Sequence, residues 1–285
     1  MGKGERERGL DIMVKTVLKN HLKLLCAAAV FLFSYVPTFI WMWDRWFARD
    51  SYYSHGVLVP FVTAFLIWQK RGELTSTEKS ESGWGMPLIV AGMLLHIFAS
   101  LLRVYFVSGF SMLIVLAGLI LYFYGLAVFQ KILFPVLFLV FMVPMPLIII
   151  TNVSFQMKIF AAKIAAGILN NIGIPALRQG SLIIMRNAQV VVDDVCSGLR
   201  SLISLMALGS IFAYWMKSSA VKKYVLFAAT IPIAVLTNVA RIIFLSSIAE
   251  IWGPQSAIGF IHDASGFLVF ALAFILLYVM VRILE

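Results

Sequence analysis

Charged residues are scarce in this sequence. They make up 13% of its 285 residues, against about 25% in ordinary soluble domains, while 62% of the residues are hydrophobic. A soluble domain cannot bury that much apolar surface, which excludes the water-soluble classes. No polar linker is long enough to divide the chain. We therefore predict one domain over residues 1–285, an all-α, polytopic integral membrane helical bundle.

Acidic residues are scarcer than basic ones, with 13 Asp and Glu against 23 Lys and Arg, and the formal net charge is +10. Such a charge also occurs in nucleic-acid-binding proteins. The lysines here, however, flank apolar runs: Lys19 and Lys23 precede the first, and Lys217 and Lys223 precede a later one. This placement is typical of cytoplasmic loops of membrane proteins. Residues 1–22 are predicted to be a cytoplasmic basic arm, and the expected surroundings are membrane lipids, not nucleic acid.

The apolar runs predict about eight transmembrane helices. Their expected ranges are 23–42, 56–70, 85–103, 106–126, 130–150, 196–216, 223–246 and 263–283. An even number of spans places both termini in the cytoplasm. The second span is short, and a further tilted span fits before residue 195, so the count lies between seven and nine.

Residues 151–195 form the longest stretch between predicted spans, and this topology places them on the outer, extracytoplasmic side. The part from 155 to 174 mixes lysines with apolar residues, which favours a helix lying in the membrane interface. The part from 180 to 192 is short, β-branched and partly alternating, which predicts a hairpin. The stretch ends at Asp194 and Cys196, at the outer mouth of span six.

Cysteine is nearly absent. Cys26 is predicted near the inner face and Cys196 at the outer face, so they cannot pair, because a disulfide needs Cα atoms within about 7 Å. The Cys196 thiol lies at a helix start, where the positive end of the helix dipole favours a thiolate. Arg200 lies one turn further on, and Asp194 either opposes the thiolate or caps the helix and holds Arg200. The alternative is a small buried cysteine beside capping aspartates.

Two further polar groups are predicted at the same membrane level. Asn238 and Arg241 share a helix face, and Arg241 lies about 27 Å along the helix from Lys223 at 1.5 Å per residue. The alternative for this arginine is snorkelling to the headgroups. His262 begins the last span beside Asp263, where the alternative is an interfacial histidine next to an N-cap. Because no histidines and carboxylates cluster at ligand spacing, neither a metal nor a cofactor is expected.

Three helices thus bring a thiol, a guanidinium and an imidazole to one membrane face. A thiol and an imidazole form the nucleophile and acid/base pair of cysteine acyl transfer. A neighbouring guanidinium can stabilise the oxyanion that forms when a carbonyl is attacked.

Five segments resemble, in order, the landmarks of the exosortases: SYYSHGVLVP (51–60), FMVPMP (141–146), VCSGLRSL (195–202), NVAR (238–241) and HDASG (262–266). The resemblance extends from about residue 22 to residue 283. It implies a cysteine-dependent peptidase and transpeptidase of the bacterial inner membrane, with its active site facing the periplasm. The implied substrates are secreted proteins whose C-terminal sorting signal combines a Pro-Glu-Pro motif, a transmembrane helix and a basic tail.

The resemblance carries the family's catalytic cysteine, arginine and histidine onto Cys196, Arg241 and His262 of this sequence. In the implied reaction, Cys196 forms a thioester with the scissile carbonyl carbon. Arg241 stabilises the oxyanion, and His262 protonates the leaving amine. The acyl group then passes to an acceptor amine or to water.

Supporting roles are expected for residues around these three. Arg200 and Asp194 are expected to tune the pocket, Asn238 to support Arg241 on the same helix face, and His55, in a loop on the outer side, to contact the substrate. Exosortases are associated with export of extracellular polysaccharide. The alternatives are therefore a transporter or non-catalytic subunit of a polysaccharide-export assembly, and a membrane acyltransferase that uses the same thiol.

Overall fold

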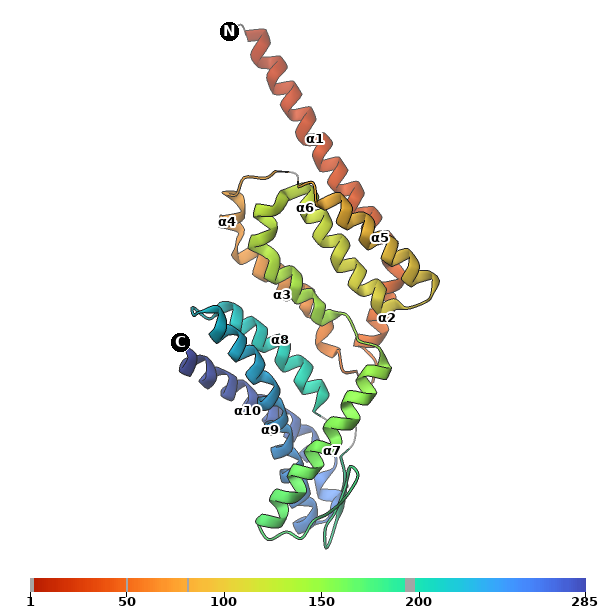
Figure 1. Cartoon of the computed structure of the whole chain (residues 1–285), viewed down its shortest axis with the longest axis vertical. Coiled ribbons are helices and arrows are strands. Elements are labelled where there is room, and N and C mark those ends of the chain that lie inside the picture. Colours follow the sequence, from red (N-terminus) through yellow and green to blue (C-terminus); the bar gives the residue numbers. More distant parts are fainter. Residues whose placement is uncertain (1–2, 50, 81, 193–197) are drawn as a thin grey trace. The chain divides into compact units, whose positions relative to one another are not determined.

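The computed structural model describes residues 3–49, 51–80, 82–192 and 198–285, and it is mainly helical (Figure 1). The elements in chain order are α1 (Lys3–Ser34), α2 (Val36–Trp46), η1 (Ser54–Val57), α3 (Val59–Gln69), α4 (Arg71–Thr75), α5 (Gly85–Leu101), α6 (Tyr105–Phe138), η2 (Leu139–Met142), α7 (Leu147–Asn171), β1 (Leu177–Gln179), β2 (Leu182–Ile184), β3 (Gln189–Val191), α8 (Leu199–Trp215), α9 (Ala220–Trp252), η4 (Pro254–Ala257) and α10 (Phe260–Leu284).

Within the described residues, four helical segments are long and apolar enough to cross a membrane: Tyr105–Met142, Leu147–Asn171, Ala220–Trp252 and Phe260–Leu284. The end of α1 and α2, bent by 56° against each other, make a fifth candidate as a broken span. Helices α3, α5 and α8 are apolar but shorter. The predicted class, a multi-pass helical membrane protein, is confirmed, whereas the number of eight spans stays a prediction.

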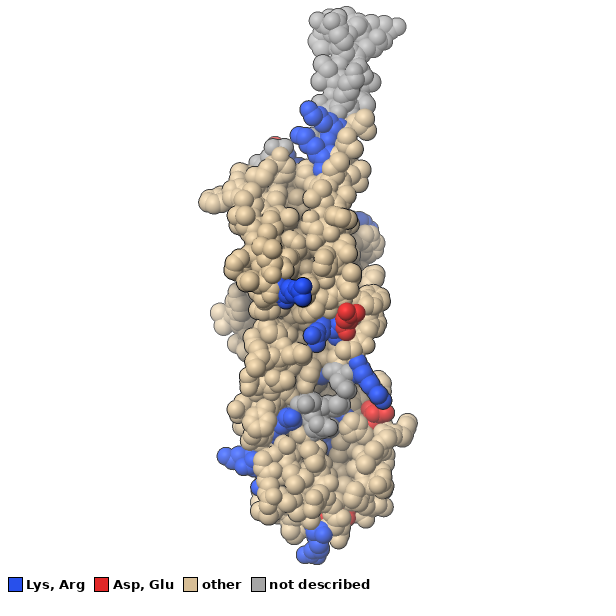
Figure 2. Space-filling view, turned by 90° about the vertical axis from the view of Figure 1, so that its right-hand side faces the viewer, with Lys and Arg blue, Asp and Glu red and all other residues tan. Residues whose placement is uncertain are grey.

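The surface of these helices is apolar where that of a soluble protein would be charged. Figure 2 shows uncharged side chains over most of the face it presents, with Lys and Arg in small separate groups. Large apolar side chains point outward on several helices, among them Phe33, Trp84 and Leu101, which are 82%, 74% and 78% exposed. Large exposed apolar side chains of this kind are favourable in contact with lipid and unfavourable in contact with water.

The contacts group the elements into two compact units. The first comprises Met1–Arg45 and Val57–Val143, and the second comprises Trp46–Gly56 and Pro144–Glu285. A single domain over residues 1–285 stays a prediction.

In the first unit, α5 packs against α6, and α6 is interrupted at Gly125. This glycine has φ 83° and ψ 176° inside an otherwise helical run, and a Cβ there would overlap the carbonyl oxygen of Ser80. Only glycine adopts such a conformation readily. Figure 1 shows that α6 changes direction along its length. The break separates the predicted spans 106–126 and 130–150.

The predicted span 130–150 is nevertheless wrong as one helix. Its first part belongs to α6 and η2, which end at Met142, and α7 begins only at Leu147. The cause is Pro144 and Pro146, since proline lacks a backbone N–H and forces the preceding residue into an extended conformation. Val143 is extended accordingly, with φ −84° and ψ 113°. As a result α7, which was expected as an interfacial helix from residue 155, starts earlier and becomes long enough to span a membrane.

Buried polar side chains join the helices of the first unit. The Tyr35 hydroxyl lies 3.0 Å from Ser111 Oγ, and Thr38 Oγ1 lies 2.6 Å from Ser108 Oγ. His96 Nδ1 in α5 lies 2.8 Å from the same Ser108 Oγ in α6. Lipid supplies no hydrogen-bond partners, so polar groups in membrane helices are satisfied by one another.

Helix α9 is the centre of the second unit and belongs to two apolar cores. Leu226 and Ala234, in its first half, pack with side chains of α8 and α10. Val239 and Ile242, in its second half, pack with α7 and the strands. Figure 1 shows α8, α9 and α10 side by side. The polar stretch from 238 to 241 therefore lies where the two cores meet.

The strands form an antiparallel sheet in the order β1–β2–β3. Leu182 pairs with Val191 and Ile183 with Val190, so β2 and β3 make the hairpin that was predicted between residues 180 and 192. Strand β1 was not predicted. Ile183 is fully buried against α7 and α9, and this contact fastens the sheet to the second unit.

Candidate active site

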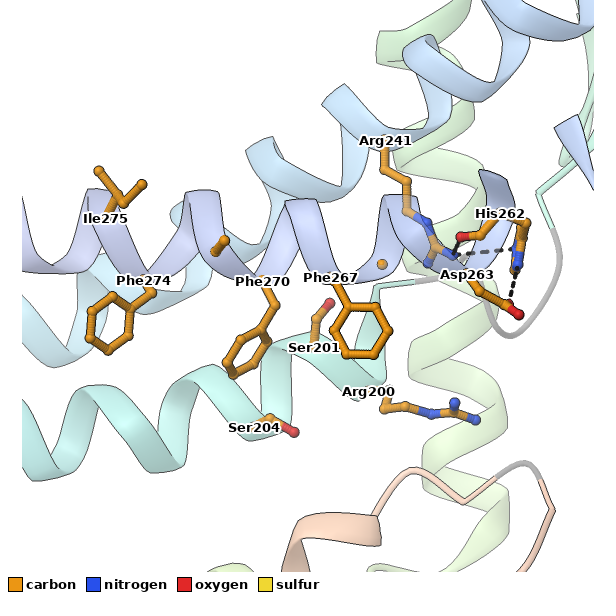
Figure 3. Close-up of a pocket in the computed structure, with 12 residues that line it drawn as sticks. Arg200, Ser201, Ser204, Arg241, His262, Asp263, Phe267, Phe270, Phe274 and Ile275 are labelled. Atoms are coloured by element: carbon orange, nitrogen blue, oxygen red, sulfur yellow. Dashed lines mark hydrogen bonds and ion pairs between the residues drawn. The ribbon is translucent and has the colours of Figure 1, made fainter. Parts of the chain in front are cut away.

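A cavity of about 850 Å³ opens in the second unit between α8 and α10 (Figure 3). Arg241 of α9 reaches it from a third helix. Its charged side chains and His262 gather at one end, and aromatic side chains of α10 face the serines of α8 along the rest. The lining residues are Arg200, Ser201, Ser204, Arg241, His262, Asp263, Gly266, Phe267, Phe270, Ala271, Phe274 and Ile275.

Arg241 directs its guanidinium to α10. Its Nε donates a hydrogen bond to Ser265 Oγ over 2.9 Å, and its Nη2 donates to the His262 carbonyl oxygen over 3.1 Å. Ser265 donates in turn to that carbonyl oxygen over 2.6 Å. Gly266 lies beside the guanidinium, and a Cβ there would lie 3.7 Å from Nη2, an ordinary van der Waals distance. Arg241 is thus held within the protein by several fixed bonds, which a snorkelling arginine would not need.

The imidazole of His262 lies between a cation and a carboxylate. Its Nε2 is 3.3 Å from Arg241 Nη2, and its Nδ1 is 3.4 Å from Asp263 Oδ1 (Figure 3). A guanidinium can only donate hydrogen bonds, so Nε2 accepts, and the ring proton belongs on Nδ1, facing the carboxylate. When the imidazole is neutral, the network therefore places its proton on Nδ1.

Asn238 fits tightly against the residue that precedes α8. Its side chain is 3% exposed. A Cβ on Gly198 would lie 2.8 Å from Asn238 Cγ, and Gly198 has φ 79°, a conformation that side-chain-bearing residues rarely adopt. The N-terminus of α8 is therefore seated on α9, one helical turn from Arg241. Cys196 and Asp194 lie outside the described residues.

Arg200 stands in the first turn of α8 and lines the polar end of the cavity. Its Nε is buried and has no hydrogen-bond partner among the described residues. Ser201 and Ser204, on the same helix, contribute hydroxyl groups to the cavity wall. Ser201 donates its hydroxyl proton to the Gly198 carbonyl oxygen over 2.9 Å.

His55 reaches the cavity only through Ser204. Its Nδ1 lies 3.2 Å from Ser204 Oγ, and its ring stacks on Tyr53 at a centroid distance of 5.9 Å. Burial lowers the pKa of His55 from 6.5 to about 4, because the charged imidazolium loses its hydration. His55 is therefore neutral near pH 7 and is a weak base. The expected contact of His55 with substrate stays a prediction, and Ser204 is the group that stands between them.

The sequence did not predict a role for Ser265, Ser204 or the aromatic side chains along α10. Ser265 lies three residues after His262, a spacing that puts both on one helix face. Phe267, Phe270 and Phe274 follow one side of α10, yet such spacing looks the same for side chains that face lipid. Among the residues that the structure describes, no three His, Cys, Asp or Glu side chains come together as a metal site would require.

Comparison with known proteins gives one match. A model of a protein family described as transmembrane exosortase (Exosortase_EpsH) matches residues 43–279, which is most of the chain. No curated protein and no solved structure matches the sequence.

Proposed function

The chain belongs to the transmembrane exosortase family, and from this premise we propose that it is a cysteine transpeptidase of the bacterial inner membrane. Membership supports a general role in sorting secreted proteins that carry a C-terminal signal. The proposed substrate signal combines a Pro-Glu-Pro motif, a transmembrane helix and a basic tail. Cleavage passes through a thioester on Cys196 at the periplasmic face.

The observation that carries this proposal is the meeting of Arg241 and His262 at the polar end of the cavity. They come from different helices, and their side-chain nitrogens lie 3.3 Å apart. Gly198, two residues after Cys196 in the sequence, packs on Asn238 of the same helix face as Arg241. Two residues of chain span at most about 7 Å, so we propose that the Cys196 thiol lies close to this point. A thiol, an imidazole and a guanidinium near one another are the groups that cysteine acyl transfer requires.

The first proposed step frees the histidine. Arg241 Nη2 donates to His262 Nε2 before the substrate binds. The scissile carbonyl oxygen attracts that Nη2 donor, while Arg241 Nε keeps its bond to Ser265. His262 Nε2 then takes the thiol proton of Cys196, and Asp263 stabilises the imidazolium at Nδ1. The start of α8 favours the thiolate that remains, because the positive end of the helix dipole lies there.

In the second step the thiolate attacks the carbonyl carbon, and Arg241 holds the oxyanion. The tetrahedral adduct collapses when His262 gives its proton to the leaving amine, and the C–N bond breaks. The acyl group remains on Cys196 as a thioester. An acceptor amine, or water, then gives a proton to His262 and displaces the thiolate, which recovers that proton. Arg200, Asp194, Asn238 and His55 are proposed to shape the pocket around these steps.

The length of α9 supports a site at one membrane face. Arg241 lies 21 residues after the first residue of α9, which corresponds to about 32 Å at 1.5 Å per residue. The hydrocarbon core of a bilayer is about 30 Å thick. If the lysines near the start of α9 mark the cytoplasmic side, as they do in most membrane proteins, Arg241 reaches the opposite interface. The proposed topology has both termini in the cytoplasm.

The test is processing of a secreted reporter that ends in a Pro-Glu-Pro motif, a transmembrane helix and a basic tail. Cys196→Ala is expected to abolish cleavage while the variant still accumulates in the membrane, because no other group in the mechanism can form the acyl intermediate. Cys26→Ala is the matched control, since Cys26 is exposed on α1, and it should process the reporter normally. Normal processing by Cys196→Ala would exclude covalent catalysis through this thiol.

A further inference from the structure

Arg200 is the cation in the cavity whose role the proposed reaction leaves open. Arg241 already donates to Ser265 and to His262, and Asp263 already faces the His262 ring. Arg200 Nε, by contrast, is shielded from solvent and has no hydrogen-bond partner among the described residues. A buried donor on a charged group is costly to leave unpaired. The unpaired Nε of Arg200 can therefore donate a hydrogen bond to an acceptor group of a bound ligand.

The charges around Arg200 indicate an anionic ligand. Among the described residues, the cavity lining carries two guanidinium groups, Arg200 and Arg241, and one carboxylate, Asp263. The Asp263 side chain is 79% exposed and lies against His262, so it does not neutralise Arg200. Figure 3 shows Arg200 at the same polar end of the cavity as Asp263 and His262. A negative group placed there would meet Arg200 close to the proposed reaction centre.

The walls of the cavity favour a peptide as the carrier of that negative group. On the α8 side stand the hydroxyls of Ser201 and Ser204, and Ser204 is within hydrogen-bond distance of His55 Nδ1. A hydroxyl that donates to an imidazole keeps its oxygen available to accept a backbone N–H. On the α10 side stand the rings of Phe267 and Phe270 (Figure 3). A lipid tail has no polar atoms and could not form hydrogen bonds with the hydroxyl groups along this wall.

We propose that Arg200 binds the carboxylate of an acidic side chain in the processed peptide, next to the bond that is cleaved. The planar guanidinium fork matches a carboxylate with two parallel hydrogen bonds, which makes Arg200 a specificity-determining residue. This inference rests on the proposed function. It makes Arg200 the side chain that binds the glutamate of the proposed Pro-Glu-Pro motif.

The experiment measures kcat and KM for full-length enzyme in membranes with two reporters, one with the natural Glu of the motif and one with Gln in its place. For the wild-type enzyme, the Gln reporter is expected to raise KM at least about tenfold, because a charge-assisted pair is lost. Arg200→Gln should raise KM for the Glu reporter by a similar factor and should no longer distinguish the two reporters. Arg200→Lys should keep part of the discrimination, since it keeps the charge but loses the fork.

Arg186→Gln is the matched control, because Arg186 is exposed in the turn after β2 and does not line the cavity; it should keep the full discrimination. Equal KM values for both reporters with the wild-type enzyme would overturn the inference and leave the proposed function standing. Retention of the Glu preference by Arg200→Gln would also overturn it. A KM effect of Arg200→Gln that follows the anionic-lipid content of the vesicles, and not the reporter residue, would assign Arg200 to a lipid phosphate instead.

Failure of the proposed function gives a different result. In that case the wild-type enzyme leaves both reporters intact, or Cys196→Ala processes them. The comparison of the two reporters with unaltered enzyme needs no variant of Arg200, so the inference can be tested even if Arg200→Gln fails to accumulate.

Discussion

At the scale of single residues, the hydrogen bonds of Arg241 support the proposed oxyanion role over snorkelling, the alternative that the sequence left open. A snorkelling arginine needs only a long stem and a charge. Arg241 instead makes hydrogen bonds from two different nitrogens, with Nε on Ser265 and Nη2 on His262. A lysine has one nitrogen at the end of its chain and cannot reproduce two donors in a fixed plane.

We therefore predict that Arg241→Lys is inserted stably but processes the reporter at least about a hundredfold more slowly, since losing one oxyanion donor costs on the order of 10²–10³ in rate in a well-studied hydrolase. The measurement is kcat at equal amounts of membrane-inserted enzyme. Arg186→Lys, on the exposed turn after β2, serves as the control and should be near normal. A near-normal rate for Arg241→Lys would return this residue to simple snorkelling.

At the scale of elements, the wall of the cavity depends on how closely α8 approaches α9. Gly209 of α8 faces Thr230 of α9, and a Cβ on Gly209 would overlap the Thr230 methyl group. Thr230 is fully buried, and its hydroxyl donates to the Phe227 carbonyl oxygen over 2.6 Å. The methyl group therefore has little room to move. Small residues at helix contacts of this kind let membrane helices pack at short distance.

Gly209→Ala is predicted to destabilise the protein by about 1–3 kcal/mol, the usual range for overpacking a core. Thr230→Ser removes the obstructing methyl group and keeps the hydroxyl, so the double variant should be more stable than the sum of the two single effects predicts, by at least about 0.5 kcal/mol. The measurement is the unfolding midpoint of purified protein in detergent.

The control for this pair is Gly167→Ala in α7, where a Cβ would meet nothing within 4 Å. Alanine favours a helix over glycine there, so this variant should be as stable as the wild type or more stable. Purely additive effects of Gly209→Ala and Thr230→Ser would show that the two helices do not touch at this point.

At the scale of the whole molecule, the orientation of the chain in the bilayer decides which side the proposed site serves. Lys19 and Lys23 on α1, and Lys222 and Lys223 at the start of α9, predict that these parts of the two helices lie on the cytoplasmic side. Cys26 lies exposed on α1 close to Lys23, while Cys196 precedes α8 in the sequence on the other predicted side. Labelling of each thiol therefore shows which face of the membrane that part of the chain lies on.

A membrane-impermeant maleimide applied from outside is predicted to label Cys196 and not Cys26. Single-cysteine variants, Cys26→Ala and Cys196→Ala, show which thiol has reacted, and labelling after permeabilisation verifies that each is reactive. Labelling of Cys196 only after the inner face is opened would reverse the topology and remove the proposed mechanism with it.

The sequence by itself determined the membrane class, most helix positions and the residue types of the candidate site. Apolar length, flanking lysines and the order of polar segments are local properties, so they can be read without knowing what packs against what. The hairpin at 180–192 was predicted in the same way, from alternation. The end of the span that begins near residue 130 was not predicted correctly. The apolar run continues through Pro144 and Pro146, and hydropathy does not reflect that proline lacks the backbone N–H a helix needs.

Only the tertiary structure decided which side chains meet. Arg241 contacts Ser265 across 24 residues of sequence, and Ser204 contacts His55 across 149. The first pairing depends on how α9 and α10 pack, and the second on how η1 packs against α8; neither follows from the composition of any one helix. That Arg200 Nε has no hydrogen-bond partner among the described residues is likewise a property of its surroundings, which depend on how the neighbouring helices pack.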